Sequence, residues 1–106
     1  MKPIRLFCAA LIMATVCAGQ ALAHTPLCAC VDNGDGTITC EGGFSDGSSA
    51  AGVSLKVKDS RGKTLIKGRM DRLSTFEFER PEGMFTVVFD AGPGHVVEIP
   101  SRVITQ

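Results

Sequence analysis

The chain has 106 residues, with 11 basic side chains, 11 acidic side chains and two histidines. It contains no Trp and no Tyr, the side chains that commonly stack on bases and sugar rings, so nucleic-acid and carbohydrate binding are disfavoured. We interpret the basic residues as scattered along the chain, and a scattered distribution gives no indication of a nucleic-acid partner.

Residues 1–23 have the pattern of a cleavable secretory signal peptide: a charged start, an apolar stretch over 6–16 and the small-x-small site Ala21-Leu22-Ala23. The apolar stretch is shorter than the ~20 residues that span a bilayer. We therefore predict an exported, periplasmic protein in which residues 24–106 form a single domain. Cleavage after Ala23 would make His24 the first residue.

Cleavage at this site changes the relevant composition. Removing 23 of the 106 residues leaves 83, with nine basic and eleven acidic side chains, which describes a small and slightly acidic domain. Three cysteines remain, so an oxidising compartment allows at most one internal disulfide and leaves one thiol. Lipid attachment at Cys17 is a less favoured alternative, because Val16 stands where a small residue normally precedes the modified cysteine.

Short runs rich in Val, Ile, Thr and Phe follow the signal segment, separated by Gly-containing turns and without a helical period. This pattern predicts an all-β, Ig-like sandwich of seven strands. Asn33-Gly34-Asp35-Gly36 predicts a hairpin turn, and the Gly- and Ser-rich stretch 42–52 predicts a crossover loop. In chain order, the predicted strands are 27–32, 37–41, 53–58, 64–70, 75–79, 84–90 and 95–99.

Alternation within these runs predicts which side chains face the core. We expect Val53, Leu55 and Val57 to lie in the core. The adjacent residues Leu65 and Ile66 and the two phenylalanines of 75–79 are expected there too. The apolar density of 84–90 predicts a central strand covered on both faces or nearly so.

The runs 52–65, 76–78 and 81–87 resemble carboxypeptidase-regulatory-like and transthyretin-like (prealbumin-like) sandwich domains. The resemblance covers about residues 35–90. It implies the sandwich fold and carries little information about function.

Four segments carry a narrower resemblance: Ala23-His24, the stretch 41–47, Ala50-Ala51-Gly52 and the stretch 90–95. Together they resemble the small periplasmic accessory components encoded with energy-coupling-factor nickel and cobalt transporters. The resemblance implies a non-enzymatic role in Ni²⁺ or Co²⁺ uptake, in which the protein delivers the ion to a membrane permease or docks on it at the membrane periphery. It also marks an N-terminal His and a Gly-His near the last strand, which match His24 and His95.

Three residues are the candidate metal ligands. His24 would offer an amine and an imidazole, a nitrogen pair suited to Ni²⁺, Co²⁺ or Cu²⁺. His95 would supply a second imidazole, and Asp90 would either bind directly or support His95. The alternatives are a frayed first residue, an ordinary exposed histidine and an aspartate that caps a Gly-Pro turn.

The cysteines allow two interpretations. Cys28 and Cys30 are too close along an extended strand to pair easily, so a disulfide from Cys40 to one of them, preferably Cys30, would staple the small domain. Cys28 is then the free thiol or the alternative partner. The rival is a copper or zinc site made by His24 and the three thiolates, a departure from the nitrogen-ligated pattern of the transporter components.

Two further patterns are not predicted to be active or binding sites. Asp32 to Gly36 fails as a calcium loop, because aligning Gly36 with the required glycine puts Val31 at the first ligand position. No Gly-x-Ser-x-Gly elbow is present, so hydrolysis is not expected. The alternative functions are a structural or protein-interaction module without metal and a copper protein that uses the N-terminal His.

Overall fold

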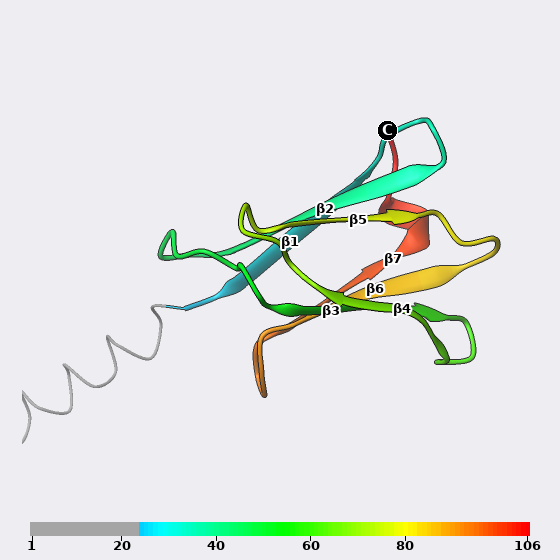
Figure 1. Cartoon of the computed structure of the whole chain (residues 1–106). Coiled ribbons are helices and arrows are strands. Elements are labelled where there is room, and N and C mark those ends of the chain that lie inside the picture. Colours follow the sequence, from blue (N-terminus) through cyan, green and yellow to red (C-terminus); the bar gives the residue numbers. More distant parts are fainter. Residues whose placement is uncertain (1–23) are drawn as a thin grey trace, which may run out of the picture.

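A computed structural model describes residues 24–106, and the predicted signal segment 1–23 lies outside the described residues. The described chain forms seven strands and one short 3-10 helix (Figure 1), and none of its helices has the length and apolar character needed to cross a membrane. In chain order the elements are β1 (Pro26–Asp32), β2 (Thr37–Phe44), β3 (Ser54–Asp59), β4 (Thr64–Arg69), β5 (Thr75–Glu79), β6 (Phe85–Asp90), β7 (Val96–Pro100) and η1 (Ser101–Val103).

The strands form two antiparallel sheets that pack face to face (Figure 1), which confirms the predicted all-β sandwich. One sheet has the order β1-β2-β5 and the other β4-β3-β6-β7. In the constant-type immunoglobulin arrangement the fourth strand lies beside the fifth. Here the fourth strand pairs with the third, because the tight turn at Asp59–Gly62 folds β4 directly back along β3.

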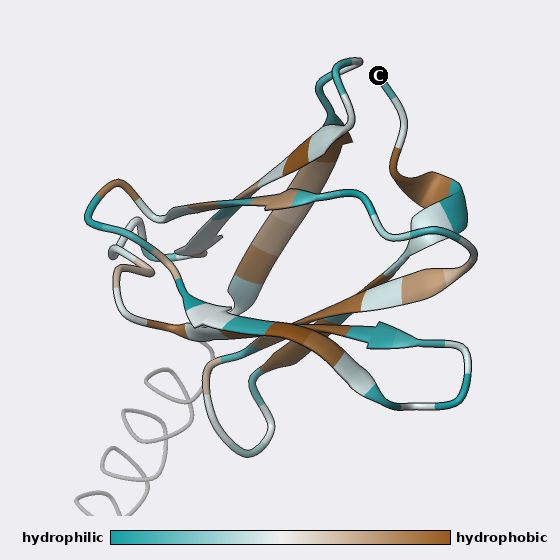
Figure 2. Ribbon diagram, turned by 45° about the vertical axis from the view of Figure 1, so that its right-hand side comes forward, coloured by the Kyte–Doolittle hydropathy of each residue, from teal (hydrophilic) through white to brown (hydrophobic). Residues whose placement is uncertain are grey.

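Alternating side chains from both sheets build the core, and Figure 2 shows apolar segments alternating with polar ones along the strands. The predicted inward positions Leu55 and Val57 are fully buried, Phe78 is buried, and Phe76 packs against the core from a half-buried position. The largest fully buried side chains are Phe89, Ile38, Leu55, Val57, Val87 and Cys40.

Two core predictions need correction. β6 is central in its sheet, as expected, but only one of its faces is fully covered. Phe85, Val87 and Phe89 are buried, whereas Thr86 and Val88 are half-buried and Asp90 is exposed. Leu65 is 43% exposed rather than inside. The register of β3 with β4 passes from the pair Val57 and Ile66 to the pair Lys58 and Thr64, so Leu65 is the extra residue of a bulge and turns away from the core.

The predicted loop 42–52 begins later than expected, because β2 continues through Gly42 and Gly43 to Phe44. Gly42 fits there for a packing reason. A Cβ at this position would lie 2.6 Å from Cε2 of Phe89, so the ring occupies the space that a side chain would need. Gly42 therefore lets β2 pass close over the core, whereas a Cβ at Gly43 would meet no atom within 4 Å.

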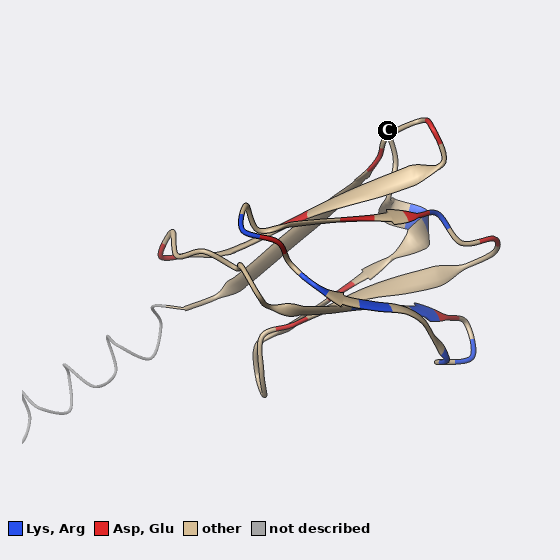
Figure 3. Cartoon of the chain, in the orientation of Figure 1, with Lys and Arg blue, Asp and Glu red and all other residues tan. Residues whose placement is uncertain are grey.

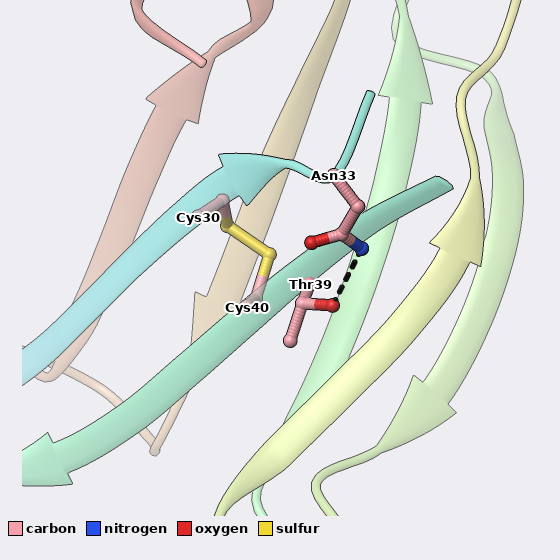
Figure 4. The surroundings of a disulfide bond; sticks show 4 residues. All are labelled: Cys30, Asn33, Thr39 and Cys40. Carbon is pink, nitrogen blue, oxygen red and sulfur yellow. Dashed lines mark hydrogen bonds between the residues drawn. A yellow bond between two sulfur atoms is a disulfide. The ribbon is translucent and has the colours of Figure 1, made fainter. Parts of the chain in front are cut away.

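Cys30 and Cys40 form a disulfide (Figure 4), which confirms the preferred pairing. The two residues are directly opposite each other on β1 and β2, with their Cα atoms 4.0 Å apart. The side-chain amide of Asn33 donates a hydrogen bond to Oγ1 of Thr39 at 2.8 Å and so ties the hairpin turn to β2. The first two strands are therefore joined covalently in the middle and by hydrogen bonds at their turn.

The basic residues are not scattered, contrary to the interpretation of the sequence. Figure 3 shows Lys and Arg gathered along β3, β4 and the turn between them. Six of the nine basic residues between 24 and 106 lie in the segment 54–69. The antiparallel pairing of β3 with β4 brings two basic stretches side by side, so strand pairing turns proximity along the chain into one charged region.

Aspartates hold several turns, and the strongest example is Asp71. Its carboxylate accepts hydrogen bonds from the backbone amides of Leu73 and Thr75 at 2.9 Å and from the Thr75 hydroxyl at 2.7 Å. These bonds, with the Thr75 hydroxyl first, lower the pKa of Asp71 below its usual value. The stabilisation is therefore present above the ordinary carboxyl pKa and is lost as the pH falls through the folded-state pKa.

We expect Asp71→Asn to be less stable than the wild type near pH 7, and the difference to shrink as the pH falls toward about 3. Urea unfolding of both proteins across this range measures it. A stability difference that is constant with pH would show that the ionised carboxylate contributes nothing beyond its hydrogen-bond geometry.

Candidate metal centre

Two turns at one end of the sandwich bring the predicted histidines together. One turn follows β2 and the other joins β6 to β7 (Figure 1). Between them lies a surface pocket of about 320 Å³ lined by His24, Phe44, Ser48, Ala91 and His95. Residues from the first and the last quarter of the described chain thus face one space.

The N-terminal segment is tied to the turn after β2, and this tie positions His24. The Thr25 amide donates to Oγ of Ser45, and the Ser45 amide donates back to the Thr25 carbonyl, both at 2.9 Å. The turn itself is closed by a bond from the Gly47 amide to the Phe44 carbonyl. His24 is therefore held beside this turn by the residue that follows it.

His95 ends the turn between β6 and β7 and lies one residue before β7, whereas the sequence predicted it as the first residue of that strand. Its backbone amide donates to the Gly92 carbonyl and its carbonyl accepts from the Ala91 amide, both at 2.9 Å. Nδ1 of the half-buried ring lies 3.1 Å from the Pro93 carbonyl. When Nδ1 donates this bond, Nε2 carries the lone pair and can bind a metal.

Asp46 is a site residue that the sequence reasoning did not single out. Its Oδ2 lies 2.7 Å from Nδ1 of His24. Its Oδ1 accepts bonds from the amide and hydroxyl of Ser48 at 2.9 and 2.6 Å. These bonds, and less strongly the charge of His24, lower the pKa of Asp46, so Asp46 is a carboxylate at neutral pH. The Asp-x-Ser spacing, typical of an Asx turn, is the signal that could have marked it.

Asp90, the third predicted ligand, does not line the pocket. Its Oδ1 accepts a hydrogen bond from the Gly92 amide at 2.9 Å, which is the turn-capping role considered as its local alternative. Direct metal binding by Asp90 stays a prediction. In the structure, Asp90 holds Gly92, and the Gly92 carbonyl in turn accepts a hydrogen bond from the His95 amide.

The alternative site made by His24 and three cysteine thiolates does not form. Cys30 and Cys40 are consumed by their disulfide, so neither is a thiolate. Cys28 is the free cysteine and not the disulfide partner, and burial raises the pKa of its thiol to about 11. A half-buried thiol with such a pKa is protonated at neutral pH and is a poor metal ligand.

The two histidines are the metal-binding residue types that line the pocket, and Asp46, which does not line it, contacts one of them. Imidazole nitrogens suit divalent metals such as Ni²⁺, Co²⁺, Cu²⁺ and Zn²⁺. Within residues 24–106, no three His, Cys, Asp or Glu side chains are close enough together to hold a metal. His24, Asp46 and His95 are therefore not assembled into a three-ligand group, although the two histidines line one pocket.

Comparisons with known protein families, curated proteins and solved structures found no match.

Proposed function

We propose that this protein is a periplasmic accessory component of a nickel or cobalt uptake transporter and that it binds the ion at the pocket between His24 and His95. The observation that carries the proposal is the convergence of these two histidines, far apart in the sequence, on one pocket. They are also the two positions that the resemblance to the transporter components marks.

The chemistry of the pocket fits a transported divalent ion. After cleavage, the amine and Nδ1 of His24 would form a chelate on one metal. Oδ2 of Asp46 lies 2.7 Å from that Nδ1, a hydrogen-bond distance, so the metal would replace the proton shared there and the carboxylate charge beside it would favour binding. Nε2 of His95 would add a further donor only after the two turns move closer together, because His24, Asp46 and His95 are not close enough to form a three-ligand group.

An incomplete and exposed donor set favours transfer over storage. The His24 side chain is 63% exposed, so a bound ion would keep contact with solvent or with a partner. Ni²⁺ and Co²⁺ accept more than four ligands, which leaves positions that a permease could occupy. The protein would then capture the ion and pass it to the permease without a conformational change of its core.

A groove beside the pocket offers a place for that permease. It has a volume of about 630 Å³ and shares Phe44 and Ser48 with the metal pocket. Two apolar side chains on its rim, Leu27 and Leu73, are 52% and 82% exposed. Exposed apolar groups beside a polar site are typical of protein interfaces, so docking here would bring the permease next to the ion.

Calorimetric titration tests the proposal. The whole chain is expressed with its signal segment, the exported protein is purified, and its N-terminus is determined by mass spectrometry. We expect Ni²⁺ and Co²⁺ to bind to protein that begins at His24, and His24→Ala with the same N-terminus to lose at least about tenfold in affinity, or ~1.4 kcal/mol. Equal binding to both proteins, or no binding to either, contradicts the proposal.

A matched pair of variants tests the contribution of Asp46. Asp46 and Asp35 make the same kind of Asx turn. Oδ1 of Asp35 accepts hydrogen bonds from the amide and hydroxyl of Thr37 at 3.0 and 2.6 Å. Asp46 differs in its contact with His24. Asn keeps the acceptor for the turn in both places and removes the carboxylate charge. We expect Asp46→Asn to weaken Ni²⁺ binding and Asp35→Asn to leave it unchanged; equal effects would remove Asp46 from the ligand set.

A further inference from the structure

The β3–β4 hairpin, residues 54–69, concentrates positive charge in a domain that is slightly acidic as a whole. The hairpin holds six basic residues and one acidic residue, Asp59. The rest of the described chain holds three basic and ten acidic residues. The domain is therefore strongly polarised, with one positive side and a negative remainder (Figure 3). The basic residues of the hairpin are Lys56, Lys58, Arg61, Lys63, Lys67 and Arg69.

The strand register places like charges against one another. Lys56 on β3 is directly opposite Lys67 on β4. Like charges in a directly opposite cross-strand pair are destabilising. The two salt bridges of the described chain are His24–Asp46 and Arg80–Asp32, so neither lysine gains an acidic partner. An unfavourable pair of this kind points to a binding role for the charged face.

We propose that the outer face of the β3–β4 hairpin binds the surface of a membrane that contains anionic phospholipid. Each basic residue near such a surface raises the membrane partition coefficient about fivefold. The attraction fades within a Debye length. Lysines outnumber arginines here by four to two. Lysine acts as a flexible point charge, which suits mobile lipid headgroups better than the fixed bidentate recognition for which arginine is used.

The position of the hairpin supports a flat membrane as the ligand. The charged side chains extend along one sheet face and its turn. A surface pocket of about 260 Å³ lies beside them, but Lys58 is its single basic lining residue and Asp59 and Glu98 line it too. Leu65, displaced outward by the bulge and 43% exposed, adds an apolar side chain to the same hairpin. The register pairs Ser54 with Asp90 and Asp59 with Phe85, so the basic turn at 60–63 lies at the opposite end of the sheet from the turn that carries His95. Binding through the hairpin turn would hold the metal pocket away from the bilayer and open to solvent, so ion capture at the membrane surface and docking of the pocket on the permease would be two separate states.

Vesicle co-sedimentation tests this inference and needs no metal, so its result is separate from that of the metal titration. The exported protein is mixed with phosphatidylcholine vesicles and with vesicles in which about a third of the lipid is phosphatidylglycerol, at low and high salt. We expect binding to the anionic vesicles alone and loss of that binding at high salt. Equal binding to both vesicles, or binding that salt does not weaken, overturns the proposal.

Two double variants separate the hairpin from total charge. Lys56→Gln with Lys67→Gln should lower the partition coefficient on anionic vesicles about thirtyfold while raising resistance to urea, because it removes the unfavourable pair. Arg72→Gln with Arg102→Gln removes the same charge outside the hairpin and should change binding less than about twofold. Equal losses in the two double variants overturn the proposal. Binding to polyglutamate but not to anionic vesicles would also overturn it, in favour of an acidic protein partner.

Discussion

Replacing Phe89 with Ala lowers the free energy of unfolding by about 3–5 kcal/mol, the range found when a buried phenylalanine is removed. Phe89 is fully buried on the central strand β6, its ring centroid lies 6.4 Å from that of Phe44, and its edge fills the space over Gly42. Removing the ring would leave a cavity over Gly42, and glycine has no side chain that could fill it. A domain of this size has a total stability of about 4–12 kcal/mol, so the substitution would remove at least about a quarter of that stability.

Urea unfolding followed by circular dichroism measures this effect. Leu73→Ala is the control, because Leu73 is 82% exposed and its removal should change stability by no more than ~0.5 kcal/mol. A loss below about 1.5 kcal/mol for Phe89→Ala would mean that the surrounding chains collapse into the space. The ring would then not be the centre of the core.

Removing the disulfide by the pair Cys30→Ala and Cys40→Ala should cost about 2–3 kcal/mol. The two cysteines are 10 residues apart in the sequence, and closing a loop of this length restricts the unfolded chain by roughly that amount. The bond also joins β1, an edge strand, to β2 at the middle of their pairing. Loss of the bond should therefore free the segment that carries His24 as well as lower global stability.

Urea unfolding of the double variant and of Cys28→Ala tests this expectation. Cys28 has a free, half-buried thiol on the same strand, so its replacement changes packing without removing a cross-link. Equal losses for the two proteins would show that side-chain volume, and not the cross-link, accounts for the effect. Hydrogen exchange of the β1 amides would show whether the edge strand opens more readily in the double variant.

Alternation of apolar and polar residues was enough to predict most of the strands. The strand 75–79 was predicted with the bounds that it has, and the others differ by one residue at one or both ends, apart from β2. The error at β2 arose because Gly42 and Gly43 read as loop residues. Glycine within a strand often marks a site where another group approaches closely, and the sequence does not reveal that Phe89 would be that group at Gly42.

The histidines show a different limit of the sequence. His24 and His95 were identified as candidates from their place in the chain, but their approach to one pocket depends on how two turns lie at the end of the sandwich. Asp46 was missed for the same reason. Its spacing to Ser48 predicts a turn, whereas its contact with His24 depends on the bonds between Thr25 and Ser45 that bring the N-terminal segment alongside.

The sequence by itself determined the all-β class, the number of strands and the preferred disulfide, because these depend on local periodicity, turn residues and residue type. The choice of His24 and His95 as candidates came instead from the predicted cleavage site and from the resemblance to the transporter components. Only the tertiary structure decided the pairing of β4 with β3, the outward position of Leu65, the contact of Asp46 with His24 and the concentration of charge on one hairpin. These features depend on register and on how distant turns meet. A change of one residue in register moves a side chain to the other face of a sheet, and local sequence does not specify register alone.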